Sequence, residues 1–310
     1  TVDLGQPGVT SLCLLAFLAD GHHPQAGPFG DCISRGMDLI LGSQKPEGLI
    51  SRYAPADRRS PHGKARRAAK AAVYNHAISG LVLGEVYGMA PPAKHAAIRQ
   101  ALAAAMRWTL QDQKGTDARP TDRGAWRYLY RKPDDDADLS VTGWQLMFLR
   151  SAQNAGFAVP SDTVDAAIGY VKRNFDSRRG TFRYKIDWRK PRINRGMAGV
   201  GILALALAGE HHSAEARAAA DWLLANPYPG FNRYTFEDET YFYGVFHCRQ
   251  AMYQLGGEYW AEYYPQLANT LLANQNADGS WARARPPRET RSARVRSGEL
   301  RSGGTLAGPI

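Results

Sequence analysis

Four aspartates stand close together near the middle of the chain, at Asp134, Asp135, Asp136 and Asp138, just before an apolar segment. Crowded carboxyl groups raise one another's pKa, and a carboxyl that stays protonated can act as a general acid. The start of a helix has the opposite effect, because its dipole favours the anion. Asp138, with Ser140 two residues later, also fits a plain helix cap. Capping, proton donation and binding of a cation or a basic partner are therefore all compatible with this cluster.

Aromatic side chains recur at a spacing of four residues in two apolar segments, as Trp144 with Phe148 and as Phe242 with Phe246. Residues four apart lie on one face of a helix, so each pair presents two neighbouring rings. Such ring faces attract cations through their quadrupoles, or they simply fill a core. A polar stripe accompanies the second pair and consists of Tyr243, His247, Gln250 and Gln254.

The elements that carry these residues are expected to be helices. Apolar residues recur at steps of three and four along most of the chain, which is the period of an amphipathic helix. The pattern predicts ten helices, over residues 11–18, 32–41, 74–87, 93–110, 139–153, 164–175, 197–208, 214–224, 241–255 and 260–272. Strand signals are few, so the expected fold class is all-α.

A short motif recurs after every second predicted helix: an amide, a turn, and a glycine with an aromatic residue close behind. The copies are Gln113 with Gly124 and Trp126, Asn174 with Gly180 and Phe182, Asn226 with Gly230 and Phe231, Gln275 with Gly279 and Trp281, and a degenerate first copy, Gln44 with Gly48. The glycine permits a tight reversal, the amide can bond backbone at a helix end, and the ring packs between neighbours. Such a repeat indicates stacked helix pairs.

These repeats, together with the helix opening from Asp138 to Trp144, resemble the terpenoid cyclase and protein prenyltransferase superfamily, in particular bacterial prenyltransferase and squalene oxidase repeat proteins. The resemblance covers about residues 9–281. It implies an α/α toroid of about five helix pairs, in which alternate helices form an inner ring around an apolar cavity. The inner helices would begin near Thr10, Tyr74, Asp138, Gly196 and Tyr241. Because the chain opens on an inner helix and stops after an outer one, the ring is expected to be incomplete.

The resemblance also implies site residues. Related cyclases carry an Asp-x-Asp-Asp motif at this point, and if Asp136 and Asp138 match its first two aspartates, Asp138 is the catalytic acid and Asp136 its partner. Leu139 then replaces the third aspartate. Inner-helix side chains are expected to bind the substrate, namely Tyr74, Trp144, Phe148, Tyr243, Phe246 and His247.

Two functions follow from this comparison. One is a class II-like terpenoid cyclase or isomerase, in which Asp138 protonates an isoprenoid. The other is a noncatalytic repeat protein that binds a polypeptide or a lipid at the cavity rim or on the ring surface. Leu139 favours the second, because it leaves the acid motif incomplete.

No cofactor or metal is expected. Protein prenyltransferases of this fold bind zinc through an Asp-x-Cys pair and a distant His, a spacing that Asp238, His247 and Cys248 do not reproduce. Adjacent helical residues also point about 100° apart. The chain contains no phosphate-binding glycine loop, HExxH motif or Ser/His/Asp signature.

The net charge of +10 is concentrated in two segments. Residues 52–70, read as a basic insertion, and residues 282–310, read as a disordered tail, leave the rest of residues 1–281 close to neutral. This distribution argues against specific nucleic-acid binding and allows at most peripheral membrane contact. No apolar run approaches the roughly 20 residues of a membrane span. The composition is that of a soluble protein, but it does not separate cytoplasm from periplasm in a bacterium and predicts no oligomeric state.

Overall fold

The structure is a computed structural model that describes residues 6–52, 63–129, 137–186, 191–233, 236 and 239–282. Asp134, Asp135 and Asp136 lie outside the described residues, as do most of the basic tail and residues 53–62 of the predicted insertion. Among the described residues, no helix is long and apolar enough to cross a membrane.

The described residues form ten helices, as predicted, and the fold is all-α. The helices are α1 (Pro7–Ala19), α2 (Gly30–Leu41), α3 (Gly63–Tyr87), α4 (Pro92–Asp112), α5 (Leu139–Asn154), α6 (Ser161–Arg173), α7 (Arg195–Leu207), α8 (Ala214–Ala225), α9 (Tyr241–Leu255) and α10 (Gly257–Leu272). A short hairpin of β1 (Phe175–Asp176) and β2 (Thr181–Phe182) lies between α6 and α7, with Phe175 opposite Phe182.

Most predicted boundaries lie within four residues of the observed ones, and the largest error is at the start of α3. Helix α3 begins at Gly63, not at Tyr74, so the second half of the predicted insertion is helical. This segment is rich in Ala, Lys and Arg, which are good helix formers but do not produce an apolar period. Helix α6 ends at Arg173, and Phe175 belongs to the hairpin.

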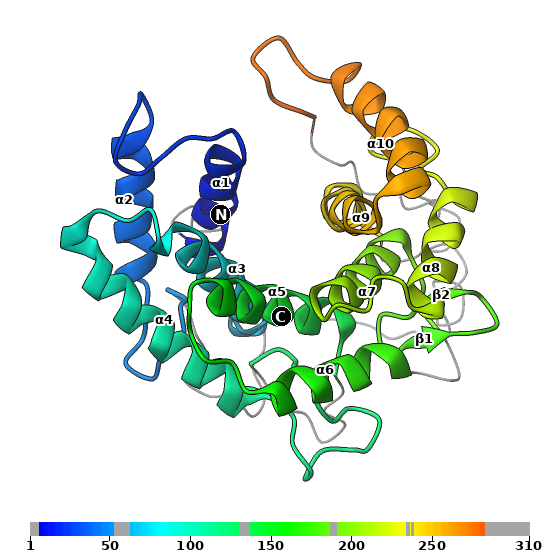
Figure 1. Cartoon of the computed structure of the whole chain (residues 1–310), viewed down its shortest axis with the longest axis horizontal. Helices are drawn as coiled ribbons and strands as arrows, with labels where there is room; N and C mark the ends of the chain where they lie inside the picture. Colours follow the sequence, from blue (N-terminus) through cyan, green and yellow to red (C-terminus); the bar gives the residue numbers. More distant parts are fainter. Residues whose placement is uncertain are drawn as a thin grey trace, which may run out of the picture.

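The helices are arranged as pairs along an open arc (Figure 1). Each odd-numbered helix packs on the next odd-numbered one, from α1 to α9, and each even-numbered helix packs on the helix before it. Figure 1 shows the odd-numbered helices on the inside of the arc and the even-numbered helices along its outside, with the α1–α2 and α9–α10 ends well apart. Alternate helices therefore form an inner and an outer layer.

Glycines let consecutive inner helices approach closely. A Cβ atom on Gly199 of α7 would lie 2.6 Å from the backbone nitrogen of Cys248 in α9. A Cβ atom on Gly80 of α3 would lie 2.6 Å from the Phe148 ring of α5. One on Gly84 would overlap the Ser151 hydroxyl. The backbone of α9 therefore fills the space beside Gly199, and side chains of α5 fill the space beside Gly80 and Gly84.

The repeat turns have the predicted structural role. The side-chain amide of Gln113 donates to the carbonyl oxygen of Gly124 at 2.8 Å and to that of Thr163, in α6, at 2.9 Å. Gly124 has a φ of 84°, a conformation that favours glycine. Gln44 repeats this pattern, donating to Gly48 and to Ala101 of α4. In these copies the amide joins one helix pair to the outer helix of the next.

The Asn copies differ because their side chain is shorter. The amide of Asn174 donates back to the carbonyl oxygen of Tyr170, and that of Asn226 donates to Trp222, each within its own helix. The motif aromatics change in burial along the chain: Trp126 is fully buried, whereas the last ring, Trp281, is 38% exposed.

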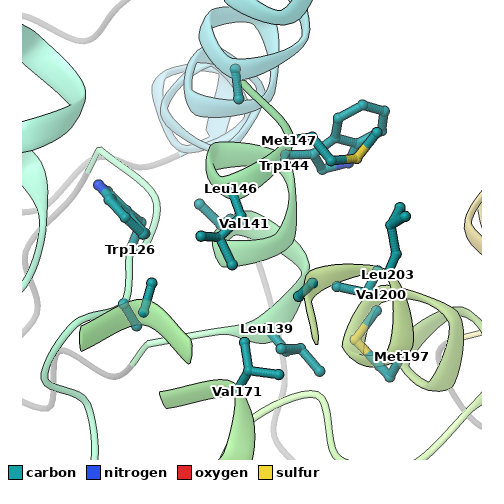
Figure 2. Close-up of a cluster of buried hydrophobic side chains, with 14 of the residues drawn as sticks. Trp126, Leu139, Val141, Trp144, Leu146, Met147, Val171, Met197, Val200 and Leu203 are labelled. Atoms are coloured by element: carbon teal, nitrogen blue, oxygen red, sulfur yellow. The ribbon is translucent and has the colours of Figure 1, made fainter. Parts of the chain in front are cut away.

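The main core lies between the two layers. Figure 2 shows Trp126 and Trp144 on opposite sides of α5, with side chains of α6 and α7 completing the cluster. Leu139, at the position of the third motif aspartate, is fully buried in the same cluster as Val171. An aspartate at this position would bury a charge among apolar side chains, which accounts for the leucine.

Candidate functional site

Asp138 caps the first turn of α5 and has no exposed surface. Its Oδ1 atom accepts hydrogen bonds from the backbone nitrogen of Val141, at 2.8 Å, and from the Ser140 hydroxyl, at 2.7 Å. These contacts satisfy one of the backbone donors that a helix start leaves free. The capping role considered for Asp138 is thus present in the structure.

The second carboxyl oxygen of Asp138 faces two side chains from loops. Arg127 forms a salt bridge to Oδ2, and the Tyr184 hydroxyl donates to the same atom at 3.0 Å. Arg127 also donates to the Tyr184 hydroxyl, at 3.0 Å. The backbone N–H of Val141 thus donates to Oδ1 and the Arg127 guanidinium to Oδ2. A carboxylate, whose two oxygens both accept, suits this arrangement.

Half-buried phenols lie around this carboxylate. The Tyr74 hydroxyl lies 2.7 Å from the Ser140 hydroxyl, and the Tyr128 hydroxyl lies 2.9 Å from that of Tyr184. Burial first, and the charge of Asp138 second, raise the pKa of Tyr74, Tyr128 and Tyr184 well above the usual value for a phenol. These phenols are neutral at physiological pH and can donate hydrogen bonds.

An aromatic group lies next to this polar cluster, where α5 faces α9. The Trp144 ring stacks on the Phe246 ring, with centroids 5.3 Å apart and planes inclined by 21°. The His247 ring meets Trp144 edge to face at 5.0 Å and lies 4.5 Å from the Tyr243 ring. The structure thus brings four of the six predicted substrate-binding residues together, from helices about 100 residues apart in sequence.

Two polar side chains in this aromatic group lack hydrogen-bond partners. His247 is fully buried, and neither of its ring nitrogens has a partner among the described residues. The Tyr243 hydroxyl likewise makes no hydrogen bond of ordinary geometry. Burial raises the pKa of Tyr243, and the nearby Ser140 hydroxyl opposes part of this rise. Burial lowers the pKa of His247 to about 3, so its imidazole is neutral.

The other two predicted residues lie in different surroundings. Phe148 is fully buried and packs on α3, against Gly80 and 5.7 Å from the His76 ring. It belongs to a core cluster other than that of Trp144, although both are on α5. Tyr74 lies beside Asp138 instead: its hydroxyl contacts that of Ser140, and its ring centroid is 6.1 Å from that of Tyr128.

Arg127, Tyr128 and Tyr184 were not among the predicted site residues. A signal for them was present, because Trp126-Arg127-Tyr128 and Phe182-Arg183-Tyr184 follow their motif glycines at the same offset. Equivalent residues of stacked repeats lie side by side. The contact between the hydroxyls of Tyr128 and Tyr184 is an instance of this rule.

A second buried histidine offers a comparison with His247. His76 accepts at Nδ1 from the backbone nitrogen of Ile50, at 3.0 Å, so the proton is on Nε2 and donates to the Thr109 hydroxyl at 2.9 Å. Thr109 donates onward to Gln145 at 3.0 Å. His76 thus joins α3, α4 and α5 through satisfied hydrogen bonds, which is a structural role.

No group of three or more His, Cys, Asp or Glu side chains within the described parts of the chain could hold a metal ion. Asp238, considered with His247 and Cys248, lies outside those parts. No protein-family model matches the chain, and no curated protein matches its sequence.

Proposed function

We propose that this chain is an α/α toroid-type repeat protein whose inner wall binds an apolar, isoprenoid-like molecule without chemical conversion. The two-layer arc of helix pairs supports the toroid architecture (Figure 1). The repeat turns support it as well, because their amides join successive pairs. The resemblance to the terpenoid cyclase and prenyltransferase superfamily rests on the same turns.

The observation that carries the proposal is the aromatic group formed by Trp144, Tyr243 and Phe246. The rings come from two inner helices, and the Tyr243 and Phe246 side chains are partly exposed. A prenyl chain offers only apolar surface and π-electron density, which aromatic rings accommodate well.

Asp138 serves as a structural carboxylate in this proposal. An acid that protonates an alkene must hold a proton on an oxygen that faces the substrate. Asp138 has no exposed surface, and Arg127, Tyr184, Ser140 and the backbone of Val141 surround its two oxygens. This environment suits an anion that ties two loops to the start of α5, and Leu139 removes the third motif aspartate.

Binding is tested by titrating the full-length protein with geranylgeraniol and following tryptophan fluorescence. We expect saturable quenching, and Trp144→Leu should weaken the affinity about tenfold by removing the stacked ring. Trp260→Leu is the matched control, since Trp260 stacks on Tyr264 of the outer helix α10. Absence of saturable binding by the folded protein would overturn the proposal.

Catalysis is tested separately, by incubation with squalene and with polyprenyl diphosphates followed by product analysis. We expect no cyclised product from the wild type. Asp138→Asn keeps a helix-capping side chain but leaves Arg127 without its carboxylate, and should destabilise the fold by about 2 kcal/mol. Product formed by the wild type and lost in folded Asp138→Asn would restore the acid mechanism.

A further inference from the structure

His247 presents an unusual arrangement for a fully buried imidazole. Both ring nitrogens lack partners among the described residues, while the rings of Trp144, Tyr243 and Phe246 have their centroids 4.5 to 5.1 Å from the centroid of the imidazole. Leaving buried polar atoms unpaired is costly, and each such case calls for a cause. His76 is equally buried, yet both of its nitrogens are hydrogen-bonded. Burial of histidine in this fold therefore does not require unpaired nitrogens.

The Tyr243 hydroxyl, which is near Ser140 but makes no hydrogen bond of ordinary geometry, is the second such group at this place. Tyr243 precedes His247 by four residues, so the two side chains share one face of α9. Together they provide a phenol donor, an imidazole donor and an imidazole acceptor, next to the stacked rings of Trp144 and Phe246. A polar group at the end of an apolar molecule would satisfy them.

We infer that the inner wall recognises the neutral hydroxyl end of its isoprenoid-like ligand through the His247 imidazole and the Tyr243 hydroxyl. This inference rests on the proposed function and narrows the ligand class to prenyl alcohols. A hydroxyl both donates and accepts, as a neutral imidazole does, so the two groups match. A diphosphate requires cationic donors, which neither side chain supplies. The rings of Tyr243 and Phe246 are partly exposed. A ligand that lies along these two rings can therefore reach the buried His247 when they move aside.

The experiment compares geranylgeraniol, geranylgeranyl diphosphate and a hydrocarbon of similar length, each titrated into the full-length protein with tryptophan fluorescence as the readout. The wild type should bind the alcohol about tenfold more tightly than the hydrocarbon, and more tightly than the diphosphate. His247→Phe keeps the ring and removes both nitrogens, so it should abolish the preference for the alcohol while leaving hydrocarbon binding unchanged. Tyr243→Phe should reduce the preference by a smaller factor.

Tyr241→Phe is the matched control, because it removes another unpaired buried hydroxyl from the same helix, on the side of Tyr228 and Phe231. It should leave the preference intact. His247→Phe should also melt no lower than the wild type, since it removes two unpaired buried nitrogens. If His247→Phe fails to fold, Tyr243→Phe decides the question.

The experiment separates failure of the proposed function from failure of the inference about the hydroxyl end. If no isoprenoid binds, the proposed function falls. If isoprenoids bind but the wild type does not prefer the alcohol, or prefers the diphosphate, the inference about the hydroxyl end is overturned while the proposed function stands. The same holds if the substitutions at His247 and Tyr243 leave the preference unchanged.

Discussion

At the scale of single residues, two fully buried histidines differ in what surrounds them. His76 sits in a chain of hydrogen bonds that links three helices, whereas the imidazole of His247 is enclosed by aromatic rings. Burial lowers the pKa of both to about 3. Both imidazoles therefore stay neutral in the folded protein at pH values between about 3 and 6.5, where the same side chains become protonated in the unfolded chain.

This difference makes the stability of the protein depend on pH. Between about pH 3 and pH 6.5 the unfolded state binds protons at His76 and His247 that the folded state does not, so the free energy of unfolding falls as the pH falls. From pH 7 to pH 5 each histidine should contribute a loss of about 2 kcal/mol. Urea unfolding at a series of pH values measures the slope of the free energy of unfolding against pH.

A substitution separates the two contributions. His247→Phe should remove about half of the pH dependence in this window, because only His76 then titrates between the folded and unfolded states. Tyr241→Phe, at the start of the helix that carries His247, is the control: it removes no imidazole and should leave the slope as it is. A slope that is unchanged in His247→Phe would mean that His247 is accessible to protons in the folded state.

At the scale of helices, the inner layer depends on glycines that let consecutive helices approach closely. Gly84 of α3 has no room for a Cβ atom, because Ser151 of α5 occupies the position. Gly88 follows the end of the same helix, has open space around it, and has an ordinary backbone conformation. A side chain is therefore excluded at Gly84 by packing but could be accommodated at Gly88.

Gly84→Ala should lower the free energy of unfolding by about 1–3 kcal/mol, since the methyl group forces α3 and α5 apart. Gly88→Ala should change it by less than about 0.5 kcal/mol, as is usual for open surface positions. Chemical denaturation of both variants gives the comparison. Equal effects would show that the contact between α3 and α5 is looser than the structure indicates.

The repeat turns allow a similar comparison between an internal copy and the last one. Gln113 donates to its own turn and to α6, whereas Gln275 donates to Gly279 within its own turn and is exposed. Gln113→Ala should cost about 1–3 kcal/mol of stability, and Gln275→Ala less than about 0.5 kcal/mol. A large effect at Gln275 would contradict the view that the amide acts by joining neighbouring pairs.

Features that depend on residues close together in the sequence could be predicted, and features that depend on distant residues could not. The ten helices and the turn glycines depend on periods and backbone conformations that are visible in short windows of sequence, and both were predicted. The start of α3 was missed because Ala, Lys and Arg form helix without an apolar stripe. The partners of Asp138 were missed because Arg127 and Tyr184 reach it from separate loops, and only the stacking of repeats brings those loops together.

At the scale of the whole molecule, the arc is a stack in which each pair contacts mainly its neighbours. Helix α5 has an inner helix on each side, α3 and α7, and most of its residues are buried. Helix α10 lies at one end of the arc (Figure 1), and Leu267 is its one buried residue. Tyr264 and Leu272 are exposed by 42% and 68%. Stability in such a stack is a sum over units and interfaces, so it should vary along the arc.

Hydrogen exchange can measure this variation directly. Amides of α5 and α7 should exchange most slowly, because opening them requires both neighbouring interfaces to separate. Amides of α10 should exchange orders of magnitude faster, since this helix can unfold while the rest of the stack remains intact. Gly84→Ala should then speed exchange in α3 and α5 and leave α10 as it was. Uniform protection from α1 to α10, altered everywhere by that one substitution, would instead mean that the arc unfolds as a single cooperative unit.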